Sequence, residues 1–454
     1  MKAVLVLAVA ACGPHLVWHG HTPNRRHDVR VVEHHGQFVE LDGVRGPTFD
    51  AIALGAFAIS PDSAHIAYAA RRSHHWSVVV DGIDGPAYDG IGEIIYSDDG
   101  AHLAFSAERG GAWRVVVDGR EGPEVTSILA HTMQLTAGHV VYAATRGDGV
   151  HVVVDGVLGT AWSGVGRLTV SGDHVAYVAR VGDIALVVAD GRAGRGYDAI
   201  TELAVAAGHV AYVAQRGNRW VAVVDDVESP AFELVRGLAF SADGAHVAFA
   251  ARRAHDDTSV IVDGVPGASY RGVRPATIAF PQGSARPTYV ARRGDRFFVV
   301  HDNVEGPPFD DIRSPVLGAE GRWGYVGRYG DAWIPVIDGV ELRAFPWAGD
   351  PVFSEDGRRV AFLARRGSDV SAIVDETEHR FDIVLDGTLA FGPSGHWGCV
   401  AGDRKQRRFY FVIDGVRQAR LEVEEAVDAS RRTKPGDDRA LHDWVLAEIG
   451  RSAR

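Results

Sequence analysis

The sequence predicts an all-β protein built from about ten or eleven copies of a four-stranded repeat of roughly 37 residues. Three observations predict this fold class. An Asp, usually followed by Gly, recurs along almost the whole chain. Short apolar runs separated by Gly-containing turns lie between its copies, and no helical period interrupts them. The recurring Asp stands at positions 42, 81, 118, 155, 190, 225, 263, 302, 338, 375 and 414, with spacings of 35 to 39 residues.

One repeat unit is clearest in residues 237–270. Apolar runs at 238–240 and 246–251 and a β-branched run at 259–262 are separated by turns, and a short extended piece follows to an aromatic residue. These segments predict four short strands. The last turn is Asp263-Gly264. An Asp-Gly pair between two apolar runs predicts a type I′ hairpin, which requires positive φ at both residues.

The predicted second strand is apolar on both faces. In residues 65–69, His-Ile-Ala-Tyr-Ala, large and small apolar side chains alternate instead of apolar and polar ones. A strand with one solvated face would show polar residues at alternate positions, so we expect sheets to cover this strand on both sides. Four-stranded sheets of about 40 residues that stack face to face are the blades of a β-propeller.

The number of repeats exceeds what one ordinary propeller holds. Propellers have about four to eight blades, so we expect two tandem propellers, at residues 13–225 and 226–434. One large ring is the alternative. The expected seam lies near Asp225-Asp226, where the Gly is lost from the turn.

The chain end departs from the repeat pattern. From Pro435 onward, Leu441, Trp444, Val445 and Ile449 have helical spacing. They predict a C-terminal helix within residues 435–454 that packs on the last blade or, alternatively, docks a partner.

Residues 1–12 are similar to a short lipoprotein signal, with an apolar core and a Val-Ala-Ala-Cys segment ending at Cys12. This interpretation predicts an exported protein, periplasmic or anchored to a membrane through a lipid on Cys12. In the alternative, His15 matches His246, residues 4–10 form a first strand, and the protein is cytoplasmic.

A short motif precedes the second strand of several repeats. Its clearest copies are Phe240-Ser241-Ala242-Asp243-Gly244, Ser97-Asp98-Asp99-Gly100, Ser354-Glu355-Asp356-Gly357 and Ser60-Pro61-Asp62-Ser63. They resemble the WD-like repeat of bacterial TolB-type β-propellers, and the resemblance implies a fold rather than an activity. At Thr136, Ser171 and Ala206 only the spacing supports equivalence.

Composition argues against several functions. The formal net charge is −12, and such a protein repels phosphate backbones, so we expect no nucleic-acid partner. Two Cys cannot build a disulfide framework or a thiolate zinc site. The common nucleophile, zinc-protease, phosphate-loop and Cys-x-x-Cys motifs are missing from the sequence. We therefore expect no enzyme, cofactor or resident metal.

Histidines recur at a fixed place. His65, His102, His139, His174 and His209 each precede the next repeat Asp by sixteen residues. A ring of imidazoles on one face is one interpretation, but a local hydrogen bond copied with the repeat is favoured. His19 and His21 are a further pair with metal-ligand spacing.

Basic loops and aromatic residues form the candidate binding face. They are expected on one face of the blades: Arg72, Arg109, Arg146, Arg216, Arg253, Arg293, Arg328 and Arg366, with Tyr88, Tyr197 and Phe309. In the favoured interpretation each Arg pairs with an acid of its own or the next blade. In the other, arginines and aromatics anchor a partner.

The sequence thus predicts a non-enzymatic scaffold that binds a protein or another envelope component. An enzyme or small-ligand binder that uses the central channel or the seam between propellers is the alternative. The sequence also predicts that Gly119→Val strains its turn, whereas Val at Glu376, where the Gly is already lost, is tolerated.

Overall fold

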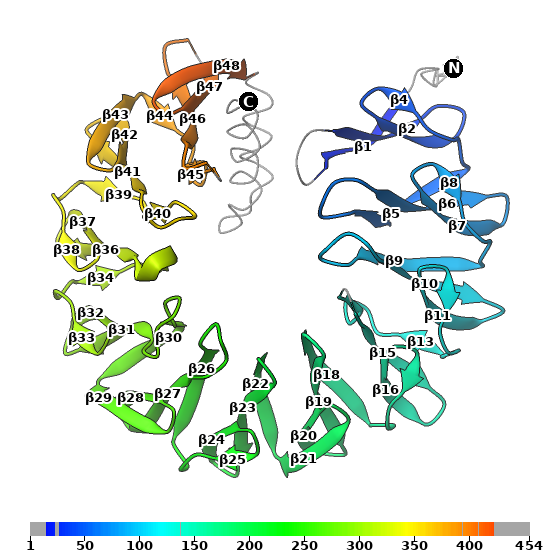
Figure 1. The fold of residues 1–454 in the computed structure, drawn as a ribbon, viewed down its shortest axis with the longest axis horizontal. Coiled ribbons are helices and arrows are strands. Elements are labelled where there is room, and N and C mark those ends of the chain that lie inside the picture. The colour runs from blue at the N-terminus through cyan, green and yellow to red at the C-terminus, as the bar shows by residue number, and fades with distance from the viewer. Residues whose placement is uncertain (1–14, 23–26, 137, 393, 407, 422–454) are drawn as a thin grey trace, which may run out of the picture. The chain divides into compact units, whose positions relative to one another are not determined.

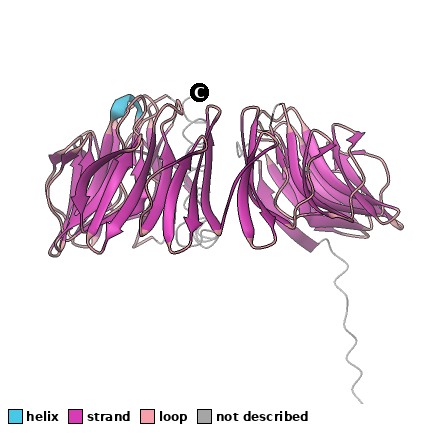
Figure 2. Cartoon of the chain, turned by 90° about the horizontal axis from the view of Figure 1, so that it is seen from below, coloured by secondary structure: helices cyan, strands magenta, loops and turns pink. Residues whose placement is uncertain are grey.

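The computed structural model describes residues 15–22, 27–136, 138–392, 394–406 and 408–421. Strands make up most of this part of the chain, and the loops that join them are short (Figure 2). They form eleven successive antiparallel sheets, called blades 1 to 11 below (Figure 1). The described residues contain one 3-10 turn, Ala319–Gly321, and no α-helix. The predicted all-β, propeller-type fold of four-stranded repeats is confirmed.

The strands of blades 1 to 4 are β1 (His15–His21), β2 (Asp28–Glu33), β3 (Gln37–Leu41) and β4 (Val44–Arg45); β5 (Ala51–Ile59), β6 (Ile66–Arg72), β7 (His75–Val80) and β8 (Ile83–Asp84); β9 (Gly90–Tyr96), β10 (Leu103–Arg109), β11 (Ala112–Val117) and β12 (Arg120–Glu121); β13 (Ser127–Ile128), β14 (Gln134–Leu135), β15 (Val140–Arg146), β16 (Gly149–Val154) and β17 (Val157–Leu158).

The strands of blades 5 to 8 are β18 (Gly164–Ser171), β19 (His174–Val181), β20 (Ile184–Ala189) and β21 (Arg192–Tyr197); β22 (Ala199–Ala206), β23 (His209–Arg216), β24 (Arg219–Val224) and β25 (Val227–Glu228); β26 (Leu234–Phe240), β27 (Val247–Ala254), β28 (Asp257–Val262) and β29 (Val265–Tyr270); β30 (Gly272–Ala279), β31 (Thr288–Arg293), β32 (Arg296–His301) and β33 (Val304–Glu305).

The strands of blades 9 to 11 are β34 (Asp311–Ile312), β35 (Val316–Leu317), β36 (Trp323–Tyr329), β37 (Ala332–Ile337) and β38 (Val340–Glu341); β39 (Trp347–Ala348), β40 (Val352–Phe353), β41 (Val360–Arg366), β42 (Asp369–Val374) and β43 (Thr377–Phe381); β44 (Ile383–Val384), β45 (Ala390–Phe391), β46 (Trp397–Asp403), β47 (Arg408–Ile413) and β48 (Val416–Leu421). In blades 4, 9, 10 and 11 two short pieces take the place of the first strand.

The chain divides into two compact units, residues 1–165 and 166–454. Blades 1 to 4 belong to the first unit, and blades 5 to 11 to the second apart from the first residues of β18. The sequence instead places a seam at 225–226, and the partition into two propellers or one ring stays a prediction. Residues 1–12 with Cys12, and the helix expected within 435–454, lie outside the described residues.

The turn between the third and fourth strands has the geometry that Asp-Gly predicts. In blade 3, Asp118 has φ 47° and Gly119 has φ 79°, as a type I′ turn requires. The copies that lack Gly keep the same backbone, with φ 64° at Asp226, 63° at Asn303 and 72° at Glu376. Strand pairing thus imposes positive φ on whichever residue stands there, and the tolerance of Val at Glu376 stays a prediction.

In the described blades other than blade 8, the carboxylate of the turn Asp holds the second strand. In blade 2, Asp81 Oδ1 accepts the Ile66 backbone N–H at 2.9 Å, and Asp81 Oδ2 lies 2.7 Å from His65 Nδ1. The same two contacts recur, with His or Arg, at the pairs His27–Asp42, His102–Asp118, His139–Asp155, His174–Asp190, His209–Asp225, His246–Asp263, Arg322–Asp338, Arg359–Asp375 and His396–Asp414. The local hydrogen-bond interpretation of the repeated histidines is confirmed.

The same contact fixes the start of blade 1. His27, whose Nδ1 lies 2.6 Å from Asp42 Oδ2, takes the place that His246 has in blade 7. His15 instead begins β1, which pairs with β2. The alternative that matched His15 with His246 is therefore wrong.

The Ser-x-Asp motif closes the turn between the first and second strands. In blade 3, Ser97 Oγ donates to Asp99 at 2.5 Å and accepts the His102 N–H at 2.9 Å. Thr136 Oγ1 likewise accepts the His139 N–H, at 3.0 Å, so the equivalence inferred from spacing is confirmed there. In blade 6 a two-residue hairpin, with Ala206 opposite His209, replaces the motif.

Neighbouring blades share apolar layers, as the alternation in the second strand predicts. Within the first unit, Tyr68 and Ala70 pack with the side chains of blade 1, whereas Ala67 and Ala69 pack with those of blade 3. All four are at most 2% exposed. The small Ala side chains let one sheet approach the next, so the core lies between the blades rather than inside one sheet.

We expect Gly119→Val to destabilise the protein by about 1–3 kcal/mol, the cost of a strained backbone position. Gly119 has φ 79° and no atom within 4 Å of the position that a Cβ would take, so backbone strain alone is measured. Gly272→Val is the control, because Gly272 also has no atom within 4 Å and lies outside the positive-φ region. Thermal melts compare the variants. Equal losses of stability in Gly119→Val and Gly272→Val would show that the turn does not restrict the backbone of its residues.

Candidate functional site

All eight predicted arginines lie at the hairpin between the second and third strands of their blades. They are Arg72 (β6), Arg109 (β10), Arg146 (β15), Arg216 (β23), Arg253 (β27), Arg293 (β31), Arg328 (β36) and Arg366 (β41). The hairpin positions inferred from the repeat are therefore correct. What these arginines contact decides how much of the predicted face is open to a partner.

Four of the arginines pair closely with an acid on the fourth strand of their own blade, and a fifth, Arg366, lies 3.9 Å from Glu378 on that strand. Arg293 makes two contacts with Glu305, at 2.7 and 2.8 Å. The other pairs are Arg72–Asp84 at 2.9 Å, Arg109–Glu121 at 2.8 Å and Arg216–Glu228 at 2.6 Å. The favoured interpretation, in which the loops are joined by arginine–carboxylate pairs, is confirmed for these four.

The same four guanidinium groups cover the aromatic ring that ends the preceding blade. Arg109 lies 4.5 Å from the ring centre of Tyr88, and Arg72 lies 4.3 Å from that of Phe49. Arg216 over Tyr197 and Arg293 over Tyr270 are longer contacts, at 5.4 and 5.3 Å. A cation near a ring face is attracted by the electrons of the ring, so the set of Arg, acid and ring joins one blade to the next.

The three predicted aromatics are packing residues. Tyr88, Tyr197 and Phe309 are 2%, 3% and 2% exposed, so their rings are not available to a partner. Tyr197 donates its hydroxyl to Glu228 at 2.7 Å. That hydrogen bond, with those from Arg216 and Arg195, lowers the pKa of Glu228. Glu228 therefore stays ionised in its contacts with Tyr197, Arg195 and Arg216. With the aromatic rings buried, only the arginines of the candidate binding face can contact a partner.

The acid after each terminal aromatic supports the hairpin at which the arginine lies. Asp89 accepts the Gly110 N–H at 2.7 Å, and Asp198 accepts the Gly217 N–H at 2.6 Å. Asp50 and Asp310 accept from Ser73 and Gly330 in the same way. The aromatic–acid pair that the sequence shows is thus a structural device of the repeat.

Three arginines depart from this arrangement. Arg328 makes no ion pair or ring contact with any residue in the described ranges, and it donates to the Gly330 carbonyl at 3.2 Å. Arg146 is exposed and makes no ion pair or ring contact with the residues that the structure describes. Arg253 is 44% exposed, and its one ion pair within the described chain is Asp257 Oδ1 at 4.0 Å. The acid is missing from blades 4 and 7, because Leu158 and Pro266 stand where Glu121 stands in blade 3.

A row of exposed aliphatic side chains was missed by sequence reasoning. In eight blades the residue two positions after the turn Asp is Val or Ile and is 61–74% exposed: Val44, Ile83, Val157, Val227, Val265, Val304, Val340 and Val416. We call these residues the aliphatic row. The sequence signal was present in the Asp-x-Val spacing, but it was attributed only to hairpin formation.

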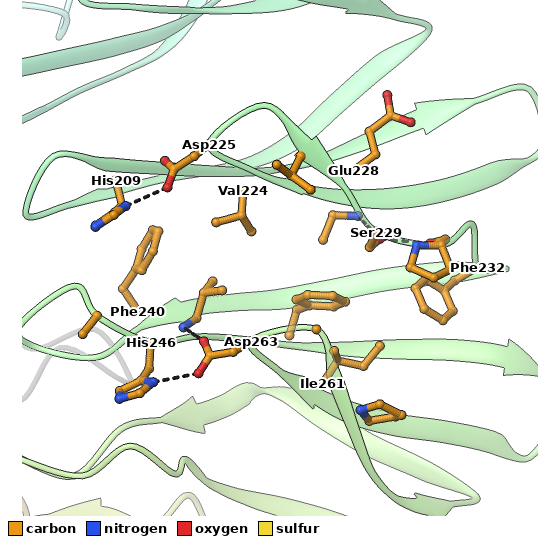
Figure 3. A pocket seen from close by; sticks show the side chains of 18 of the residues that line it. His209, Val224, Asp225, Glu228, Ser229, Phe232, Phe240, His246, Ile261 and Asp263 are labelled. Atoms are coloured by element: carbon orange, nitrogen blue, oxygen red, sulfur yellow. Dashed lines mark hydrogen bonds and ion pairs between the residues drawn. The ribbon is translucent and has the colours of Figure 1, made fainter.

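Grooves lie beside this row, between consecutive blades. The groove of blades 6 and 7 has a volume of about 620 Å³ (Figure 3). Grooves of about 500 and 510 Å³ lie at the matching places between blades 1 and 2 and between blades 3 and 4. In Figure 3 the pairs His209–Asp225 and His246–Asp263 lie at one end, and Ser229 and Phe232 lie toward the other.

The described residues contain no group of three or more His, Cys, Asp or Glu that could hold a metal ion. His19 contacts Asp28 through its Nε2 atom. No helix in the described part of the chain is long and apolar enough to cross a membrane.

No family model matches the chain, and no curated protein matches it. Among solved structures it is similar to a prolyl endopeptidase, with 10% identity over 64% of this chain and 55% of that one and a TM-score of 0.27. It is also similar to KlHsv2 with loop 6CD replaced by a Gly-Ser linker, with 12% identity over 63% of this chain and 98% of that one and a TM-score of 0.26. A third similar structure is TolB from Acinetobacter baumannii, with 15% identity over 51% of this chain and 62% of that one and a TM-score of 0.22. The chain thus spans less than two thirds of the endopeptidase and of TolB, and such low TM-scores support no functional conclusion.

We expect Tyr197→Phe to destabilise the protein by about 1.5–3 kcal/mol, the value of a hydrogen bond to a charged group. Tyr142→Phe is the matched control. The Tyr142 hydroxyl is buried without a hydrogen-bond partner in the described chain, and burial raises the pKa of Tyr142 to about 12. Removing it should be neutral or slightly stabilising. Thermal melts of both variants test this, and equal effects would contradict the role given to Glu228.

Proposed function

We propose that the chain is a non-catalytic, propeller-type scaffold that binds protein partners through its repeated blades. The aliphatic row is the observation that carries this proposal. Single exposed apolar side chains are common on protein surfaces, but these eight stand at one place in the repeat. Exposed apolar surface that recurs in this way is typical of an interaction site.

Hairpin formation alone does not require these side chains. β-Branched residues favour strands, and Thr satisfies that preference as Val does. Thr377 takes this place in blade 10, and Arg120 and Arg192 take it in blades 3 and 5. Because the strand forms without an aliphatic residue there, the exposure of Val or Ile in eight blades supports a binding role.

The arginine hairpins are the second proposed contact surface. Arg72, Arg109, Arg216 and Arg293 are each neutralised by an acid, which weakens their attraction for an anionic partner. Arg146, Arg253 and Arg328 are the members that no close carboxylate in the described residues neutralises. The binding experiment below therefore compares this surface with the aliphatic row.

We also propose that the repeats are of the bacterial WD-like, TolB type. The observation that supports this is the turn of the Ser-x-Asp motif, which has the same hydrogen bonds in blades 2, 3, 7 and 10. The motif thus has one structural role in these four blades. It says nothing of a catalytic activity, which agrees with the proposal of a scaffold.

A variant with Val157, Val227, Val265 and Val304 all changed to Thr should lose most partner capture from lysate of the native organism. Its thermal stability should stay close to that of the natural chain, because Thr keeps the branched shape and these positions are exposed. The control variant, Arg146→Gln with Arg328→Gln, changes arginines of the hairpins that join no blades and should retain capture. Loss only in the control would move the site to the arginine hairpins, and turnover of a small molecule by the pure chain would contradict a non-catalytic role.

For the chain's location we propose export and lipid attachment at Cys12, which lies outside the described residues and rests on the sequence alone. Labelling with a palmitate analogue should mark the protein, which should fractionate with membranes, and Cys12→Ser should lose both properties. A product that retains Met1 and carries no label would contradict this proposal.

A further inference from the structure

The groove of blades 6 and 7 contains an arginine that the repeat leaves unneutralised. Where the hairpin arginine meets an acid, that acid stands three residues after the turn Asp, as Glu305 does after Asp302 in blade 8. In blade 7 the same position is Pro266. Arg253 also lacks the aromatic contact that Arg293 makes with Tyr270. Arg253 therefore lines the groove with unfilled hydrogen-bonding capacity.

The single ion pair of Arg253 is weak. Asp257 Oδ1 lies 4.0 Å from Arg253 Nη1. The same oxygen accepts the Ser269 hydroxyl at 2.6 Å. Arg253 thus lines this groove without a carboxylate at close hydrogen-bonding distance. A planar guanidinium matches a carboxylate through two parallel hydrogen bonds.

The wall of the groove is apolar and already formed. The half-buried Val224 and Phe240 line it and give accessible apolar surface, whereas Phe232, Phe249 and Ile261 are almost fully buried. Val227 of the aliphatic row and Pro266 complete this wall. A volume of about 620 Å³ lies within the usual size of ligand sites, about 300–1,000 Å³.

The two ends of the groove differ in charge. Arg253 precedes β28 and Asp263 follows it, and the six residues of β28 span about 20 Å at roughly 3.3 Å per residue. At the far end, Asp225 and Asp263 pair with His209 and His246 (Figure 3). Glu228 also lines the groove, but Arg195 and Arg216 pair with it. An anion is therefore accommodated at the Arg253 end, and the length suits an extended chain of about six residues.

We propose that this groove binds the C-terminal tail of a partner protein, with the terminal carboxylate on Arg253 and the preceding apolar side chains along the wall. This inference rests on the proposed scaffold function and names the part of the partner that is recognised. A free alkanoic acid offers the same carboxylate chemistry and is tested beside the peptide.

The probe is a dye-labelled hexapeptide, Ser-Gly-Val-Val-Phe-Val, with a free C-terminus, and the comparison is the same peptide with a C-terminal amide. Fluorescence anisotropy with the full chain should show saturable binding of the acid, with the amide at least tenfold weaker. Arg253→Gln should weaken binding of the acid at least tenfold. Pro266→Glu should do the same without removing the arginine, because it restores the acid that the repeat has elsewhere.

Arg358→Gln is the matched control, because Arg358 is 86% exposed, belongs to no proposed contact surface and lines none of the three grooves. Binding by this variant should equal that of the natural chain, and thermal melts confirm that each variant is folded. Equal binding of acid and amide, or unchanged binding by Arg253→Gln, would overturn the proposal. Decanoate binding that needs Arg253, without peptide binding, would overturn the peptide as occupant. None of these results alters partner capture through the aliphatic row, so the two proposals fail separately.

Discussion

The structure depends on one repeated interaction, the contact of the turn Asp with the start of the second strand. The carboxylate accepts a backbone N–H from that strand with one oxygen and meets a His or Arg side chain with the other, as Asp81 does with Ile66 and His65. This contact fixes the third strand against the second at one end of the blade. Because a shift of one residue would turn apolar side chains to the wrong face, it also secures the inter-blade core.

The interaction tolerates exchange of the partner side chain between His and Arg but keeps the carboxylate. Arg322 and Arg359 replace His in blades 9 and 10, and both keep their contacts with Asp338 and Asp375. The positive φ of the turn is likewise kept where Gly is replaced, as at Glu376. The repeat is therefore defined by one hydrogen-bonding geometry that several sequences satisfy.

Much of the fold could be predicted because its causes are local. The Asp-Gly turns, the double-sided second strand and the histidine contacts follow from spacing and residue type within one repeat. The candidate site could be predicted only in part, because burial depends on the neighbouring blade. Tyr88 and Phe309 resemble surface anchors in sequence, yet the next sheet covers both. The importance of Arg253 was equally hidden, since it arises from the absence of an acid at Pro266, on another strand.

The hold on the turn Asp also bears on the chemical durability of the chain. An Asp-Gly linkage rearranges to isoaspartate when the backbone nitrogen of the Gly attacks the side-chain carboxyl carbon. Here the carboxylate of residues such as Asp118 is bound away from that nitrogen, to Leu103 and His102 of another strand. The same contacts at the other Asp-Gly turns slow isoaspartate formation there as well. This protection lasts only while the blade stays folded.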